Sequence, residues 1–171
     1  MVKKILFLVS LTFLTATFIS AQRLAIVDIN GVLESMAEYK TAQGELDKIA
    51  AEWRQEIAKQ YDKIKSMYNK YQAEQVLLSD DIRRQREDEI MEKEKEVREL
   101  QKVKFGPEGE LFQKRQELVA PIQDKVYAAV EGFADDRGYE LILDKGGSAG
   151  IIFYKPELDK TEDVQKRLGI E

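Results

Sequence analysis

The sequence predicts an α+β protein that is mostly α-helical, with a long antiparallel helical hairpin (a coiled-coil tentacle) projecting from a small β-containing body. Three observations predict this fold class. No Gly or Pro occurs among the 61 residues from 45 to 105. At about 1.5 Å per residue this stretch would make one helix roughly 90 Å long, but Ser79-Asp80-Asp81 divides it. Short apolar runs rich in β-branched residues lie near both ends of the chain, at 24–29 and 139–154.

The N-terminal residues have the pattern of an export signal. A basic segment, residues 1–4, precedes an apolar run over 5–19 and the small residues Ser20 and Ala21. This order predicts a signal peptide over residues 1–21, cut after Ala21, and therefore export. An uncleaved membrane anchor is the alternative, but the 15-residue run is shorter than the roughly 20 residues that span a bilayer.

Composition excludes several classes of function for residues 22–171, which are expected to form a single domain. The 25 basic and 32 acidic residues argue against a nucleic acid partner, because phosphate binding needs a basic face. Cys and His are both absent, which removes the commonest general base, metal ligand and thiol nucleophile. We therefore expect no enzyme, no cofactor and no metal. Paired carboxylates such as Asp80 and Asp81 are interpreted as a solvated helix face.

The first strand and the start of the helical region follow the export signal. Residues 24–29 predict a buried strand, and Asn30-Gly31 punctuates it. A helix is expected to begin near Val32, or alternatively at Ser35, with Glu38 completing a capping box. The body is predicted over 22–35 and about 110–171, and the helical arm over about 36–109.

The outbound helix carries an apolar stripe whose steps of four and three residues are typical of a coiled coil. Its members are Leu46, Ala50, Trp53, Ile57, Gln60, Ile64, Met67, Tyr71, Glu74 and Leu78. Ile49, Tyr61 and Tyr68 widen this stripe. Its side chains either pack against the returning helix or form an exposed, adaptable surface.

A turn and a charged return helix come next. Ser79 can cap a new helix whose positive end suits Asp80 and Asp81; one continuous helix is the alternative. The return helix is expected over 82–105, with few apolar positions and many oppositely charged pairs four residues apart. So few apolar residues indicate a thin arm surrounded by solvent.

The break at 106–109 is predicted to form a hinge made by Gly106, Pro107 and Gly109, because proline interrupts a helix. Helix resumes near Leu111, with a second bend at Pro121, and ends at Gly138 in a left-handed cap.

Two strands at 139–144 and 150–154, joined by a Gly-rich loop, predict a hairpin that pairs with the first strand. The loop lacks the lysine and the following helix of a phosphate-binding loop. A final helix is expected over 161–168, capped by Thr161 or Asp159.

The predicted body is too small to stand alone, so we expect it to associate with other copies. The residues expected to form this oligomerisation body are Leu24, Ile26, Val27, Ile29, Leu141, Leu143, Ile151 and Phe153.

An exported protein with projecting arms and no catalytic equipment is suited to holding another chain. Several arms could enclose an unfolded client and keep it from aggregating by mass action alone. The residues expected to contact the client are Trp53, Ile57, Tyr61, Ile64, Met67, Tyr68, Tyr71, Leu77 and Leu78. The alternative is a structural or adaptor coiled coil of the cell envelope that binds one folded partner.

The order of these elements resembles a known family. The chain is similar to the Skp (OmpH-like) periplasmic chaperones. The resemblance lies in the export signal, in Leu24-Ala25-Ile26-Val27-Asp28 followed by Val32-Leu33, in the charged hairpin, and in Leu141-Ile142-Leu143-Asp144 with its Gly-rich turn. The resemblance implies a homotrimer whose three tentacles hold unfolded outer-membrane proteins in the periplasm without ATP. Family members are often basic, which suits acidic clients and a peripheral membrane contact. This chain departs from them in its acidic charge and in the break at 106–109.

Overall fold

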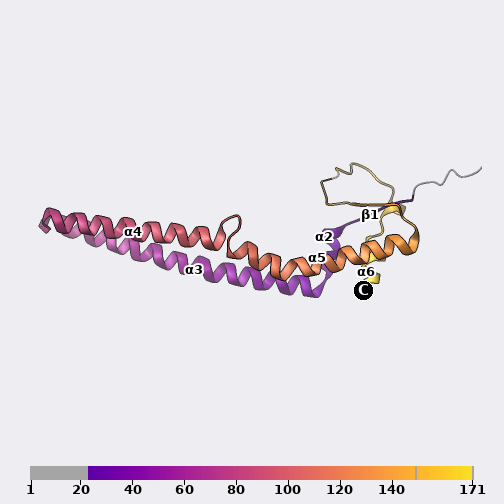
Figure 1. The fold of residues 1–171 in the computed structure, drawn as a ribbon, viewed down its shortest axis with the longest axis horizontal. Coiled ribbons are helices and arrows are strands. Elements are labelled where there is room, and N and C mark those ends of the chain that lie inside the picture. Colours follow the sequence, from indigo (N-terminus) through magenta and orange to yellow (C-terminus); the bar gives the residue numbers. More distant parts are fainter. Residues whose placement is uncertain (1–22, 149, 171) are drawn as a thin grey trace, which may run out of the picture.

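The computed structural model describes residues 23–148 and 150–170, so the predicted signal peptide lies outside the described residues. The protein is a long limb of helices joined at one end to a small body (Figure 1). In chain order its elements are β1 (Leu24–Val27), α2 (Ile29–Ser35), α3 (Ala37–Glu74), the 3-10 turn η1 (Gln75–Leu77), α4 (Asp80–Phe105), α5 (Glu110–Arg137), β2 (Leu141–Asp144), the 3-10 turn η2 (Pro156–Leu158) and α6 (Thr161–Arg167).

The sheet of the body consists of β1 and β2, which run parallel with Leu24 opposite Leu141 and Val27 opposite Asp144. Parallel neighbours need a long crossover connection. Here the crossover is the entire helical limb, which leaves the body after β1 and returns to it before β2 (Figure 1). The two ends of the chain therefore meet in one sheet, as the sequence predicts.

The predicted hairpin between 139–144 and 150–154 is wrong. Only the first of these segments is a strand, and residues 150–154 are not part of the sheet. The physical reason lies further along the chain, where the Lys160 amide donates to the Ile26 carbonyl at 2.8 Å. The returning chain thus joins the far edge of β1 and does not lie beside β2.

The first helix begins earlier than predicted. Asp28 caps α2 by accepting a hydrogen bond from the Gly31 amide at 2.8 Å, so Asn30 and Gly31 lie inside the helix. The capping-box alternative at Ser35 is also wrong. Its hydroxyl donates to the Val32 carbonyl, and α3 starts behind Met36 without a side-chain cap.

The larger apolar core joins the body to the base of the limb. It combines side chains of β1, α2, the first turns of α3, the middle of α5, and α6. Val27, Val32, Val126 and Val164 are its most completely buried members. Because α3 and α5 both contribute, the two long helices are fixed where they leave the body.

Beyond this core, α3 pairs with α4 as an antiparallel hairpin. We call residues 51–105 the distal arm. Its core consists of four buried side chains, Ile57 and Ile64 from α3 with Ile90 and Val97 from α4. This confirms the predicted thin arm and the seam of the outbound helix.

The tip of the hairpin follows the predicted turn. Ser79 caps α4, whose first turn contains Asp80 and Asp81, and its Oγ accepts from the Ile82 amide at 3.5 Å. Both acidic side chains lie at the positive end of the α4 dipole. The turn therefore comes from local capping chemistry rather than from a glycine or proline.

The break at 106–109 is a loop between α4 and α5, and α5 runs on through Pro121. A Cβ on Gly106 would collide with the Lys102 carbonyl oxygen, so this glycine is required by a close backbone approach. On the other side of the limb α3 is continuous. Any bend at the predicted hinge must therefore also bend α3 near Trp53, and the hinge stays a prediction.

The backbone requires glycine at position 138 but not at position 44, so the same substitution should have opposite effects on stability at these two positions. Gly138 ends α5 with φ of 66°, as the sequence predicts, while Gly44 lies in the interior of α3 with nothing within 4 Å of an added Cβ. We expect Gly138→Ala to lower the free energy of unfolding by about 1 kcal/mol and Gly44→Ala to raise it by about 0.5–1 kcal/mol. Urea unfolding of both variants measures the difference, and equal effects would contradict this account.

Candidate functional site

The exposed side of the distal arm carries two tyrosines seven residues apart on α3. Tyr61 is 43% exposed and Tyr68 is 48% exposed. Residues seven apart lie on the same side of a helix, so both rings belong to one flank, which we call the tyrosine flank. Next to it, Tyr61 and Phe105 line an open hollow of about 390 Å³, and the Tyr61 hydroxyl lies 3.4 Å from Oε1 of Gln101.

The opposite flank of the hairpin is hollowed along the line where α3 meets α4. Two adjoining hollows of about 400 and 190 Å³ share Met67, and we call them together the lysine groove. Half-buried apolar side chains of both helices, including Met67, Tyr71 and Leu100, form its floor. The groove is open, so it offers a surface for a chain and no enclosed pocket for a small molecule.

The tip presents apolar side chains to solvent. Val76 is 83% exposed and Leu77 is 84% exposed, both in η1. Ile82, in the first turn of α4, adds a third partly exposed side chain at 43%. Side chains of this kind at the end of a charged limb are candidates for contact with another molecule.

The structure divides the predicted client-binding residues into three groups. Ile57 and Ile64 are buried in the core of the distal arm and cannot reach a partner without opening it. The half-buried members are Trp53, Met67, Tyr71 and Leu78, and the exposed ones are Tyr61, Tyr68 and Leu77. The exposed and half-buried groups are thus the ones available for contact.

Sequence reasoning missed Val76, Ile82 and Met91 as surface candidates. Met91 is 56% exposed on α4, next to the buried Ile90. The sequence did indicate exposure for Val76 and Ile82, because apolar residues next to the turn between two helices at the end of an arm have few neighbours that could bury them. For Met91 the sequence contained no such indication. It directly follows the buried Ile90, and the sequence alone does not say which of two adjacent apolar residues faces the other helix.

Trp53 lies opposite the break between α4 and α5 and forms a small aromatic and charged cluster there. Its ring packs edge-on against Phe105, with 6.1 Å between centroids. The Lys104 ammonium lies 4.5 Å from the centre of the Trp53 ring and 2.6 Å from the Glu110 carboxylate. These contacts tie the end of α4 to α3 and to the start of α5.

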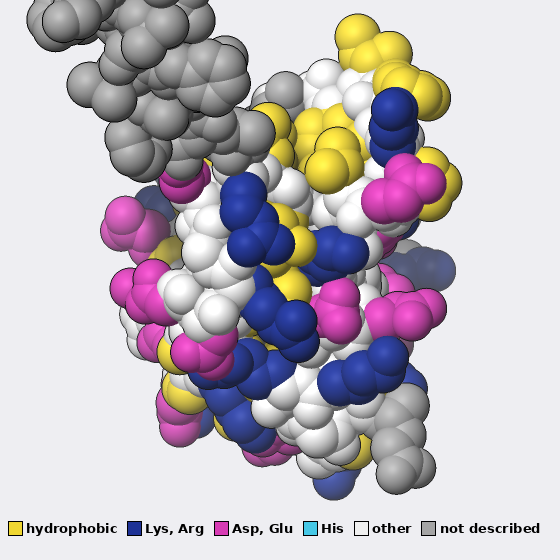
Figure 2. All heavy atoms as spheres, turned by 90° about the vertical axis from the view of Figure 1, so that its right-hand side faces the viewer, with side chains coloured by type: hydrophobic (Ala, Val, Ile, Leu, Met, Phe, Trp, Pro, Cys, Tyr) yellow, Lys and Arg dark blue, Asp and Glu magenta, His cyan; other side chains and the backbone are white. Residues whose placement is uncertain are grey.

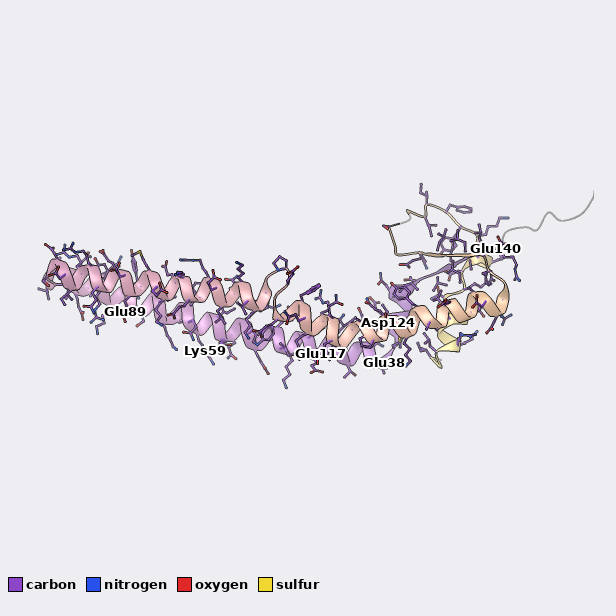
Figure 3. The ribbon with its side chains drawn as sticks, in the orientation of Figure 1. Glu38, Lys59, Glu89, Glu117, Asp124 and Glu140 are labelled. Atoms are coloured by element: carbon purple, nitrogen blue, oxygen red, sulfur yellow. The ribbon has the colours of Figure 1, made fainter. Side chains whose placement is uncertain are left out.

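The acidity of the protein does not extend to the distal arm. Residues 51–105 contain thirteen basic and thirteen acidic residues, so the excess of acidic residues lies in the body and the base of the limb. Charged side chains project along the whole limb, from Glu89 near the tip to Glu117 at the base (Figure 3). The distal arm can therefore meet a partner without long-range repulsion or attraction from net charge.

Ion pairing within the distal arm differs between the two helices. Six intrahelical ion pairs lie within α4, such as Lys93 with Glu96 at 2.6 Å. The Glu96 carboxylate raises the pKa of Lys93 through this hydrogen bond. By contrast, four lysines of α3 have no carboxylate of the described residues within ion-pair distance: Lys59, Lys63, Lys65 and Lys70.

The predicted oligomerisation residues are also divided by the structure. Ile26, Val27 and Ile29 are buried within the single chain. Leu143 and Ile151 are half-buried, and the exposed members are Leu24, Leu141 and Phe153. Ile152, which was not predicted, is fully exposed beside Phe153. Hydrophobic side chains gather along one edge of the body end (Figure 2).

A polar network holds the C-terminal segment against β1. The Thr161 hydroxyl accepts from the Asp28 amide at 2.9 Å and donates to Asp159 at 2.6 Å. Burial alone would raise the pKa of Asp159, but hydrogen bonds from Thr161 and Tyr154 and the charge of Lys145 outweigh it and hold that pKa below its usual value. The network stabilises the body and borders an open hollow of about 500 Å³ lined by Asp28, Lys145 and Asp159.

Within residues 23–148 and 150–170, no group of His, Cys, Asp or Glu side chains has an arrangement that could hold a metal ion. None of the helices in the same part of the chain combines the length and the apolar character that crossing a bilayer requires.

The fold and its surfaces define a class of protein that presents a long helical hairpin on a small β-containing body. The chain belongs to the OmpH-like outer membrane protein family, whose model matches residues 23–168. A solved structure of similar fold is that of a candidate outer membrane chaperone (OmpH-like) from Caulobacter crescentus, with a TM-score of 0.68 and 14% sequence identity, covering 90% of this chain and 88% of that one. No curated protein sequence matches the chain.

Proposed function

We propose that this protein is an ATP-independent holdase chaperone of the periplasm that binds unfolded outer-membrane proteins between its helical arms. The observation that carries the proposal is a long arm without net charge that exposes Tyr61, Tyr68 and Leu77 to solvent. Such side chains offer many weak apolar contacts to a chain that has no fixed shape. Membership of the OmpH-like family supports the same function.

The proposed chaperone acts as an oligomer, a homotrimer as the resemblance to the Skp (OmpH-like) chaperones implies. Exposed apolar side chains of the body support association, since Leu24 and Leu141 face solvent as neighbours across the sheet, and Ile152 and Phe153 lie exposed on the segment after β2. A two-stranded sheet is also too small to be stable without further packing. The arms of the associated copies would then enclose a shared space.

The test is suppression of aggregation. A urea-unfolded β-barrel protein is diluted into buffer with and without the chaperone, and light scattering is followed. We expect suppression at about one proposed trimer per client, because binding acts by mass action on the unfolded chain. Absence of suppression at every salt concentration, combined with capture of one folded partner, would favour the adaptor function instead.

A matched pair of variants tests the tyrosine flank. We expect the double variant Tyr61→Ser, Tyr68→Ser to weaken client binding about fivefold to tenfold, because two half-exposed rings lose their apolar contacts. Tyr127→Ser is the control, since Tyr127 is 56% exposed but lies on α5, away from the distal arm. Fluorescence anisotropy with a labelled unfolded client measures both. Equal loss in both variants would place the contact outside the tyrosine flank.

A further inference from the structure

The lysine groove combines an apolar floor with two lysines of α3 on its rim. Lys63 and Lys70 line the groove from α3, and among the described residues neither has an ion-pair partner. On the α4 side, Lys93 and Arg86 also line it, but each is paired with a glutamate of its own helix. Glu74 lines the tip end of the same rim, one helical turn beyond Lys70. The unpaired positive charge available to a ligand is therefore on the part of the α3 rim that contains Lys63 and Lys70.

The floor between these rims is apolar and only partly covered. Met67 belongs to both hollows, with Leu100 at one end and Leu78 at the other. From residue 60 to residue 78 the groove follows about five turns of helix, or roughly 27 Å, which equals the length of about eight residues of extended chain. Its shape suits an extended segment rather than a compact ligand.

We infer that the lysine groove binds extended client segments in which apolar residues alternate with Asp or Glu. This inference rests on the proposed function and names the kind of segment that the arm selects. Strands of outer-membrane barrels alternate apolar and polar side chains. With the apolar residues on the floor, the flexible stems of Lys63 and Lys70 let their ammonium groups reach carboxylates on the other side of the segment. Segments carrying Lys or Arg at the same positions are disfavoured.

The chain supplies a matched control for this inference. Lys59 and Lys65 belong to the same stretch of α3 and are likewise unpaired among the described residues, but neither lines the groove. The double variants Lys63→Gln, Lys70→Gln and Lys59→Gln, Lys65→Gln change the net charge equally. Any difference between them therefore reports position and not overall charge.

The experiment measures anisotropy of a labelled ten-residue peptide in which Val and Leu alternate with Asp and Glu, and of a second peptide with Asn and Gln in their place. We expect the wild-type protein to bind the acidic peptide about threefold to tenfold more tightly at low salt, as two partly exposed charge pairs would give. The preference should decrease as salt is added. It should disappear in Lys63→Gln, Lys70→Gln and persist in Lys59→Gln, Lys65→Gln.

Equal binding of both peptides by the wild-type protein, or equal loss in the two double variants, would overturn the groove assignment. Suppression of client aggregation is measured with the same preparations. Suppression without any preference for the acidic peptide contradicts the groove alone. A clear preference without suppression contradicts the holdase function and leaves the groove in place.

Discussion

Replacing Phe133 by Ala is expected to lower the free energy of unfolding by about 3–5 kcal/mol, because it opens a large cavity in the core that joins the limb to the body. Phe133 is 5% exposed on α5 and stacks on Tyr139, with 5.6 Å between ring centroids. Tyr139 lies two residues before β2, so the cavity loosens the link between α5 and the sheet. Urea denaturation at fixed protein concentration measures the change.

Phe112→Ala is the control for this prediction. Phe112 is on the same helix but is 45% exposed, so the same change of side chain removes little buried area. Both substitutions improve intrinsic helix propensity by the same amount, which therefore cancels in the comparison. Equal destabilisation by the two variants would show that the surface around Phe112 is covered in the assembled protein.

Much of the limb could be predicted from the sequence because its structure depends on local chemistry. The stripe ending in Leu78, the Ser79 cap and the left-handed Gly138 all act within a few residues of their own positions. The body could be predicted only in part. Whether residues 150–154 form a strand beside β2 depends on where the chain goes next, and here it crosses to the far edge of β1, where the Lys160 amide donates to the Ile26 carbonyl. Apolar alternation indicates a strand but does not identify its neighbour.

The candidate site was predictable to a similar extent, and for a related reason. The periodicity identified the apolar stripe correctly, but it could not separate Ile64, which is buried in the seam, from Tyr61 and Tyr68, which flank it. That separation depends on where α4 lies across α3. The lysine groove has the same origin, since its two rims come from different helices and no single segment of sequence contains both.

The acidic and basic residues are distributed unevenly along the chain, and this matters for the binding of acidic clients. The sequence as a whole is acidic, which argues against electrostatic capture of acidic clients. The distal arm, however, has no net charge, and the unpaired lysines of α3 place positive charge locally. Because charges more than about 8–10 Å away are largely screened at physiological salt, the acidic body has little influence on a client held near Lys63 and Lys70.

The stability of the distal arm depends on very few side chains, so Ile90→Ala is expected to affect it strongly. Ile90 is 5% exposed and is one of the four residues in the arm core. The expected loss is about 2 kcal/mol, at the lower end for such a substitution, because the neighbouring hollow already lets solvent approach the site. The larger core of the body does not include Ile90, so the body should stay folded.

Hydrogen exchange can separate these two responses. Elements with few buried contacts open locally at low free energy, so amides over 57–100 should lose protection while those of α5 and the body keep theirs. Ile82→Ala, on the same helix but 43% exposed, should leave exchange nearly unchanged. If the arm holds clients as proposed, Ile90→Ala should also reduce suppression of aggregation. Unaltered exchange along the arm of this variant would mean that contacts beyond the four core residues hold the hairpin together, such as contacts between the arms of neighbouring copies.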